Sequence, residues 1–190
     1  MKRFSKYLLA MLLPLTVLLV RPLTPAAVLA FGQEIRLSTE PVDPRDIFRG
    51  DYVTLRFSIE EPDESLLSER DKETISERLH YSNNDFDAPS IFLYVSLAPD
   101  GEGIWQPAGI FLTPPEAGVY LQAQAYREYH SEDIELDYGN YLKRYYVREN
   151  TGRELEDAAR RGELVGLVKV WRGRAVLTSV EAKNTITGEK

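Results

Sequence analysis

The chain has 190 residues, of which 30 are Asp or Glu and 23 are Lys or Arg, so its formal net charge is −7. This length suits one domain of ordinary size, and 43% hydrophobic with 28% charged residues excludes both a disordered polymer and a protein with many membrane spans. The acidic excess argues against a nucleic-acid partner, and zero Cys with two His excludes disulfides, thiolate zinc sites and His-rich metal sites. We therefore expect no metal and no cofactor.

The first 31 residues have the composition of a membrane-targeting segment. Three bases in the first six positions precede a largely apolar run over residues 7–20. As a helix this run is about 21 Å long, shorter than the roughly 30 Å hydrocarbon core. It is either the apolar part of a secretory signal cleaved after Ala30, or the start of an uncleaved anchor that continues to about Phe31. Both alternatives keep the basic flank in the cytoplasm and place the rest of the chain outside. A helix buried in a soluble core is disfavoured, because the segment is apolar all round.

Alternating apolar and polar residues predict the first strands of the domain. They run over residues 34–39 and residues 52–59. Between them, Asp43 followed by Pro predicts one helical turn, because Asp is a good N-cap and Pro suits the first helical position. The inner faces of the two strands are expected to carry Ile35, Leu37 and Thr39, and Val53, Leu55, Phe57 and Ile59, respectively.

The middle of the chain predicts a surface helix and then a hairpin. Residues 60–81 are rich in charged and small polar residues, which indicates a connection with a surface helix and no second domain. The apolar run 91–98, the Gly-containing turn 100–103 and the run 104–111 predict two antiparallel strands.

The last third predicts more strands and one short helix. A strand is expected over residues 119–126 and a polar strand pair within residues 134–147. A capping box predicts a helix over residues 151–161 that ends at Gly162. Two apolar runs around Arg-Gly predict a final hairpin over residues 164–181.

Seven or eight short strands with two short helices predict a mainly β (α+β) fold. We expect a single β-rich, barrel- or sandwich-like domain preceded by one N-terminal transmembrane helix. Residues 1–31 are expected to form the cytoplasmic basic flank and the signal-anchor, and residues 32–190 the extracytoplasmic domain.

The segment 41–57 combines turn-forming residues with closely spaced charges of both signs. One interpretation is structural, with Gly50 in a left-handed conformation and the charges paired locally. The other is a docking surface for a partner, whereas a catalytic role is disfavoured because no nucleophile is found with its base. The residues of this motif and docking role are Asp43, Arg45, Arg49, Gly50, Asp51, Tyr52, Leu55 and Phe57.

Seven of the eleven tyrosines fall within the 27 residues from Tyr120 to Tyr146. Tyrosine is common in half-buried strands, so sheet packing is one explanation. An exposed aromatic platform for a glycan, a peptide or a protein is the other. The candidate platform residues are Tyr120, Tyr126, Tyr141 and Tyr145.

Glu149 and Glu154 are the candidates for acid–base hydrolysis, which uses two carboxyl groups. Glu154 also has a structural explanation, as the capping-box partner of Thr151 in the expected helix. No Walker loop, dinucleotide fingerprint, zincin helix or serine elbow occurs, so we expect no enzyme activity.

Residues 50–57, GDYVTLRF, resemble the signature of the GDYXXLXY domain family of bacterial membrane-anchored proteins. The segments 40–49, 146–156 and 168–180 are also similar to the family pattern. As an ordered set, these segments extend the resemblance over roughly residues 7–181.

The resemblance implies an N-terminal transmembrane anchor with one extracytoplasmic domain, and it favours an uncleaved anchor. The family is often encoded beside large polytopic membrane proteins, which implies a partner of that kind, and it brings no established catalytic residues. Where the signature ends in Tyr, this chain has Phe57, and loss of a hydroxyl from an apolar face fits packing. We expect a non-enzymatic envelope protein, in the periplasm or another extracytoplasmic space, that docks to a polytopic membrane protein. The alternative is an envelope protein that binds or hydrolyses a glycan or peptide.

Overall fold

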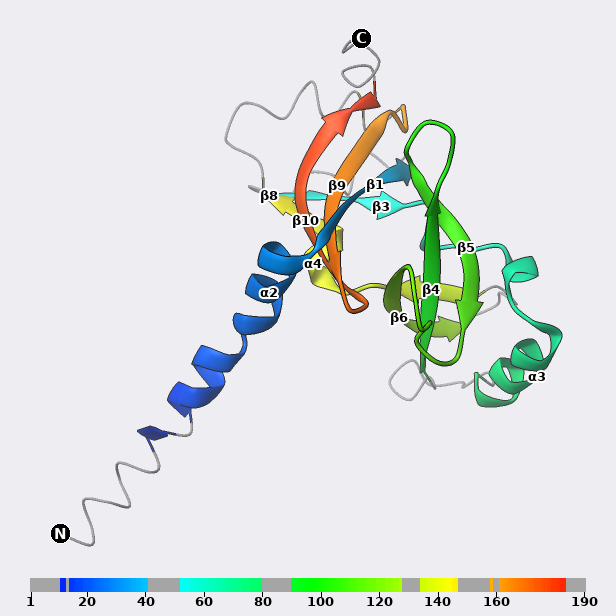
Figure 1. The fold of residues 1–190 in the computed structure, drawn as a ribbon, viewed down its shortest axis with the longest axis horizontal. Coiled ribbons are helices and arrows are strands. Elements are labelled where there is room, and N and C mark those ends of the chain that lie inside the picture. Colours follow the sequence, from blue (N-terminus) through cyan, green and yellow to red (C-terminus); the bar gives the residue numbers. More distant parts are fainter. Residues whose placement is uncertain are drawn as a thin grey trace, which may run out of the picture.

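The structure is a computed structural model that describes residues 11–12, 14–40, 52–79, 90–127, 134–146, 158 and 161–183. Two curled four-stranded sheets form the domain, and an N-terminal helix projects away from them (Figure 1). The first sheet has the order β10 (Arg174–Ala182), β9 (Leu164–Trp171), β1 (Gln33–Glu40) and β3 (Arg56–Phe57). The second has the order β5 (Trp105–Phe111), β4 (Ile91–Pro99), β6 (Val119–Arg127) and β7 (Ile134–Asp137). The predicted mainly β fold class is confirmed.

Short elements complete the domain. They are the strand pair β2 (Tyr52–Thr54) and β8 (Arg144–Tyr146), the 3₁₀ turn η1 (Glu64–Leu66), and the helices α2 (Leu23–Phe31), α3 (Glu69–Arg78) and α4 (Asn140–Lys143). The predicted surface helix is α3. It begins after Ser68, whose hydroxyl accepts the Asp71 N–H at 3.1 Å, and it buries Ile75 against the domain.

The hydrophobic core lies between the two sheets. The alternation predicted for β1 is confirmed, because Ile35, Leu37 and Thr39 are all buried. The buried Thr39 hydroxyl donates to the Leu164 carbonyl at 3.0 Å, so it is not left unsatisfied. The facing side chains are Ile35, Leu37, Phe57, Val168 and Val170 in the first sheet and Leu93, Val95, Leu97, Leu121 and Ala123 in the second.

The prediction of a single strand over residues 52–59 is wrong. The segment forms two short strands, β2 and β3, which belong to different sheets. The Leu55 N–H donates to the Lys143 carbonyl at 3.0 Å beside the β2–β8 pair, whereas Phe57 pairs with β1 in the first sheet. The predicted inner face is nevertheless confirmed for Leu55, Phe57 and Ile59, which are all buried.

The strand pair expected within residues 134–147 is also wrong. Two strands do form there, but β7 pairs with β6 and β8 pairs with β2. The Asp137 carboxylate accepts the Gly139 N–H at 2.8 Å, and Gly139 has a φ of +87°. This turn ends β7, and α4 then directs the chain to a different partner instead of back along the same sheet.

The helical turn expected after Asp43 lies outside the described residues, and so does most of the helix expected over residues 151–161. The end of this second helix is described and agrees with the prediction. Gly162 has a φ of +65°, and the Glu163 N–H donates to the Ala158 carbonyl at 2.9 Å. A left-handed glycine with this hydrogen bond is a common helix ending.

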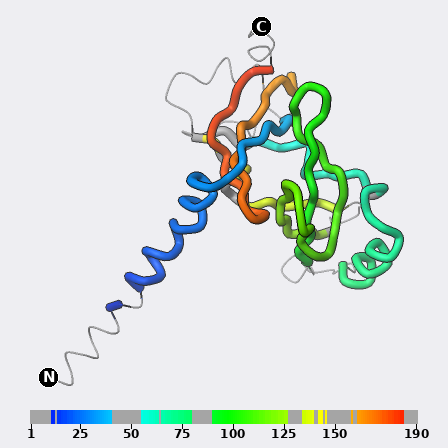
Figure 2. Tube along the Cα trace, in the orientation of Figure 1, coloured from blue at the N-terminus to red at the C-terminus, as the bar shows by residue number. Residues whose placement is uncertain are grey.

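The N-terminal helix has two pieces, residues 14–20 and α2, separated by a turn at Arg21 and Pro22. The stretch Pro14–Phe31 is apolar enough to cross a membrane, and only 6% of it is buried in the protein. Figure 1 and Figure 2 show it extending away from both sheets. The helix is therefore not part of a soluble core.

Gly166 provides a test of packing between β9 and the Phe57 ring. A Cβ atom there would lie 2.7 Å from Phe57 Cε1 and 3.0 Å from Cζ. Because such overpacking costs about 1–3 kcal/mol, we expect Gly166→Ala to lower the free energy of unfolding by that amount in urea titrations of the full chain in detergent. Gly101→Ala is the control, since a Cβ there has open space. Equal losses in both variants would contradict the packing explanation.

Candidate functional site

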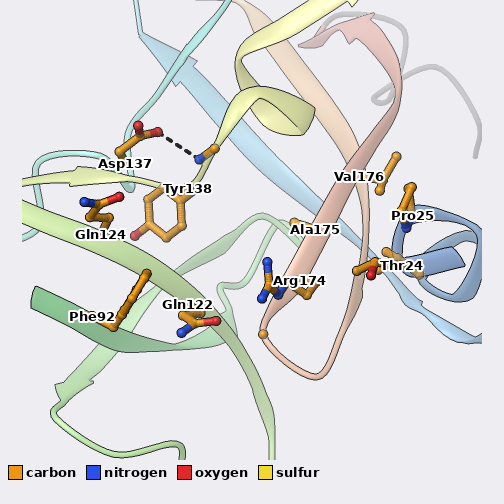
Figure 3. A pocket seen from close by; sticks show the side chains of 13 residues that line it. Thr24, Pro25, Phe92, Gln122, Gln124, Asp137, Tyr138, Arg174, Ala175 and Val176 are labelled. Carbon is orange, nitrogen blue, oxygen red and sulfur yellow. Dashed lines mark hydrogen bonds between the residues drawn. The ribbon is translucent and has the colours of Figure 1, made fainter. Parts of the chain in front are cut away.

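A cleft of about 510 Å³ lies where the N-terminal helix meets the two sheets (Figure 3). Its volume falls within the roughly 300–1,000 Å³ that is usual for ligand sites. The walls come from α2, from β4 and β6, from the turn after β7 and from the start of β10. The lining side chains with most bearing on its chemistry are Thr24, Pro25, Phe92, Gln122, Asp137 and Arg174.

The turn between β9 and β10 forms one wall of the cleft. Both of its residues have positive φ, 49° at Arg172 and 76° at Gly173, as in the two-residue turns that suit the twist of a hairpin. The Gly173 carbonyl accepts the Gln122 N–H at 2.8 Å and so joins this turn to β6 of the second sheet. A Cβ atom on Gly173 would lie 2.8 Å from Tyr120 Cε2, so both conformation and space favour glycine here.

In the described part of the chain, Arg174 and Asp137 are the charged residues that line the cleft, and only Asp137 is paired. Arg174 projects from β10 between Gln122 and Thr24 (Figure 3) and has no ion-pair partner among the described residues. The Asp137 carboxylate lies 3.2 Å from Lys143 Nζ and also accepts the Gly139 N–H described above. Of the residues that the structure describes, the cleft therefore presents one available cation.

The end of α2 is fastened to the outer side of the hairpin. The Lys169 ammonium donates to the Leu29 carbonyl at 2.8 Å, near the C-terminal end of the helix. The Phe31 ring lies 6.0 Å from the Trp171 ring, and the Arg172 guanidinium lies 4.8 Å from that indole ring centroid. A cluster of aromatic and cationic side chains therefore surrounds the point where the helix enters the domain.

Glu60 is a buried carboxyl group behind the cleft, with 5% of its surface exposed. Its Oε1 accepts the Phe57 N–H at 3.1 Å, and its own N–H donates to the Phe57 carbonyl at 3.0 Å. Burial raises the pKa of Glu60 above its ordinary value, although the Phe57 hydrogen bond and the charges of Lys143 and Arg56 oppose this shift. Glu60 does not line the cleft. Its two hydrogen bonds to the Phe57 backbone give it a structural role, in which it closes the turn at the end of β3.

Tyr138 connects the turn closed by Glu60 to the cleft. Its hydroxyl donates to the Ile59 carbonyl at 2.9 Å, and its ring lines the cleft. Burial, with a smaller effect of the Glu60 charge, raises the pKa of Tyr138 above its ordinary range. The phenol therefore remains a protonated donor and holds the residue after β7 against the end of β3.

The structure describes the second half of the predicted motif. Asp43, Arg45, Arg49, Gly50 and Asp51 lie outside the described residues, so their docking role stays a prediction. The backbone of Tyr52 begins β2 and pairs with Tyr146, whereas Leu55 and Phe57 are buried in the core with 2% and 1% exposure.

The four candidate platform tyrosines come from three separate elements. Tyr120 and Tyr126 lie on β6 and Tyr145 on β8, and these three side chains are half-buried. Tyr120 packs edge-on against Tyr94 with ring centroids 6.0 Å apart. Tyr141 lies in α4, and its side chain is outside the description. The platform stays a prediction.

The candidate hydrolytic pair, Glu149 and Glu154, lies outside the described residues. In the described part of the chain, no three His, Asp or Glu side chains are grouped so that they could hold a metal ion.

The cleft and the buried carboxyl group are absent from the sites predicted by sequence. The Arg172-Gly173 turn is recognisable from its residues, and it marks where Arg174 emerges. Nothing in the sequence places this turn beside Gln122, and the nearby charged residues Glu61 and Asp63 are exposed, so Glu60 does not stand out among them.

A comparison with protein families shows which family the chain belongs to. The family model described as GDYXXLXY protein matches residues 14–180, which is most of the chain. The chain belongs to the GDYXXLXY family. Comparisons with curated proteins and with solved structures give no match. In this GDYXXLXY protein, Leu55 and Phe57 of the signature are core residues at the point where the chain crosses between sheets.

Glu60 makes the stability of the GDYXXLXY domain depend on pH. Because its pKa is raised in the folded state, the folded chain binds more protons than the unfolded chain above about pH 4.5. We expect the free energy of unfolding to fall as the pH rises from 4.5 through the folded-state pKa. Glu60→Gln should remove this part of the decrease, measured as urea midpoints from pH 4.5 to 7.5. The exposed Glu116→Gln is the control, and an unchanged pH dependence in Glu60→Gln would contradict the assignment.

Proposed function

We propose that this GDYXXLXY protein is a non-enzymatic, membrane-anchored interaction domain that docks to a polytopic membrane protein. The domain faces the extracytoplasmic side, in the periplasm or an equivalent space, and the basic N-terminus remains in the cytoplasm. The observation that carries the proposal is the direct connection between the apolar helix and the folded domain, in which one residue separates α2 from β1 and the helix end contacts the domain. This connection gives the domain one fixed orientation toward its neighbours in the membrane.

The connection is supported by contacts at the end of α2. Gly32 separates the end of α2 from the start of β1, and its N–H donates to the Val28 carbonyl at 2.8 Å. Val28 is 1% exposed, and Lys169 holds the Leu29 carbonyl. Cleavage after Ala30 would remove these contacts from the domain, which favours an uncleaved anchor over a cleaved signal.

The position of Glu40, the last described residue before the motif segment 41–51, supports a partner that extends above the membrane. β1 begins beside α2 and ends at Glu40, where the segment 41–51 begins. Seven residue steps of strand span about 23 Å. β1 continues roughly in the direction of the helix (Figure 1). Glu40, to which the motif segment is joined, therefore lies at the end of β1 away from the helix, on the side where extramembrane loops of a polytopic neighbour would extend.

The anchor is tested by membrane extraction. We expect the full chain to remain in the membrane pellet after an alkaline carbonate wash and to have the intact mass that includes residue 1. Leu15→Arg with Leu18→Arg should move it toward the soluble fraction, because each Arg costs about 2.5–3.5 kcal/mol in a bilayer. Glu73→Arg with Glu77→Arg on α3 is the control. Release of the unchanged chain, or a mature chain that begins at Phe31, would contradict the anchor.

Docking is tested by site-specific photo-crosslinking in native membranes. A photoreactive residue in place of Arg45 should form an adduct with a polytopic membrane protein through its extramembrane loops. The same probe in place of Glu73 on α3 should not form this adduct. Arg49→Ala with Asp51→Ala should lower the adduct yield at least tenfold while the urea midpoint stays unchanged. An equal yield from both probe positions, or no effect of the double variant, would contradict docking through this motif.

A further inference from the structure

We propose that the cleft beside α2 binds the phosphate-bearing headgroup of an anionic membrane phospholipid, with Arg174 as its main contact. This inference rests on the membrane anchoring proposed above. It adds a ligand class and a binding site that do not involve the proposed docking motif.

The position of the cleft determines which ligands reach it. Thr24, Pro25 and Val28 form one of its walls, and all three belong to the apolar stretch Pro14–Phe31. The cleft therefore opens directly beside the helix that enters the bilayer. A lipid of the adjacent leaflet is the molecule with the highest local concentration at that opening.

The charge of the cleft fits a phosphate. Arg174 is exposed into the cleft, and its guanidinium has no ion-pair partner in the described ranges. Among the described residues, the one lining carboxylate is that of Asp137, which Lys143 and the Gly139 N–H already engage. A planar guanidinium donates two parallel hydrogen bonds to a phosphate group, a geometry that a lysine ammonium cannot match.

A second polar group faces the same space. The Gln122 side-chain amide lies beside Arg174 in the cleft (Figure 3) and makes no hydrogen bond within the described part of the chain. The neighbouring Gln124 differs, because its amide donates to the Ser90 hydroxyl at 2.7 Å. The Gln122 amide is therefore available to bind the ester or hydroxyl oxygens of a headgroup.

Apolar side chains complete the match to an amphipathic ligand. Phe92 lines the cleft with 59% of its surface exposed, and Pro25 and Val176 face it from the helix and from β10. Outside the cleft, Phe31 is 72% exposed beside Trp171. Aromatic residues next to cations are typical of the interface between lipid and water.

Lysines and arginines near the helix end add a local positive field to a chain whose overall charge is negative. Lys169, Arg172 and Arg174 lie on one hairpin, and Arg21 lies at the break of the helix. Glu34 is an acidic neighbour on the same sheet face and is opposite Lys169 in the strand register. This end of the domain therefore complements an anionic lipid surface.

The test uses the full chain, purified in dodecyl maltoside and stripped of lipid. Native mass spectrometry would follow titrations with dioleoyl phosphatidylglycerol and, in parallel, dioleoyl phosphatidylcholine. We expect the first phosphatidylglycerol to bind at least tenfold more tightly than phosphatidylcholine. Arg174→Gln should lower the phosphatidylglycerol affinity about tenfold or more, because it removes a charge-assisted hydrogen bond. The exposed Arg78→Gln on α3 is the matched control and should bind like the unchanged chain.

Gln122→Ala is the second variant, in case Arg174→Gln lowers the urea midpoint, and it should weaken phosphatidylglycerol several-fold. Equal binding of the two lipids overturns the proposal, as does unchanged affinity in the folded cleft variants. Competition by glycerol 3-phosphate as effective as that by the lipid also overturns it, because the site would then serve a soluble phosphate. Since the chain is in detergent, this result is independent of the carbonate test of anchoring.

Discussion

The hydrogen bond from the Gln122 N–H to the Gly173 carbonyl is the contact on which the arrangement of the domain depends. It ties the tip of the β9–β10 hairpin to β6, so the two sheets are linked by backbone as well as by their shared core. The same hairpin pairs with β1 and packs against α2. One turn therefore sets the angle between the sheets, forms a wall of the cleft and orients Arg174. A bulky residue at Gly173 would disturb all three, because its Cβ has no space beside Tyr120.

The family signature has a structural meaning at this level. Its second half carries the chain from the β2–β8 pair into the first sheet, with Leu55 buried at the crossing and Phe57 packed against Gly166. Glu60 then closes the end of β3 through the Phe57 backbone, and Tyr138 holds the end of β7 to the same corner. The corner beside the signature thus provides a second connection between the two sheets, where the Leu136 N–H also donates to the Glu60 carbonyl at 3.0 Å. Packing accounts for the apolar signature positions without a catalytic role.

Much of the fold could be predicted, because its long strands alternate or are strongly apolar and its main hairpin has a recognisable Arg-Gly turn. The short strands β2, β3, β7 and β8 could not, since their partners are chosen by contacts distant in sequence, such as the Leu55 N–H with the Lys143 carbonyl. The same limit applies to the site. Gln122 and Arg174 become neighbours only through the tip of a hairpin that meets another sheet. From the sequence alone, Glu60 cannot be distinguished from the exposed charged residues that follow it. Its burial becomes evident only in the structure, beside the buried Phe57 of β3.

The helix α2 and the first strand β1 are joined without a flexible linker. A domain on a flexible linker samples many orientations, whereas here one residue, Gly32, separates α2 from β1. In a chain anchored as we propose, the tilt of the helix becomes the tilt of the domain. Membrane helices tilt by about 20° on average. Over the roughly 23 Å of β1, such a tilt moves the strand end at Glu40 sideways by about 8 Å. Because bilayer thickness affects the tilt of the helix, it would thereby change the sideways distance between the helix and the strand end at Glu40, from which the motif segment continues toward a partner.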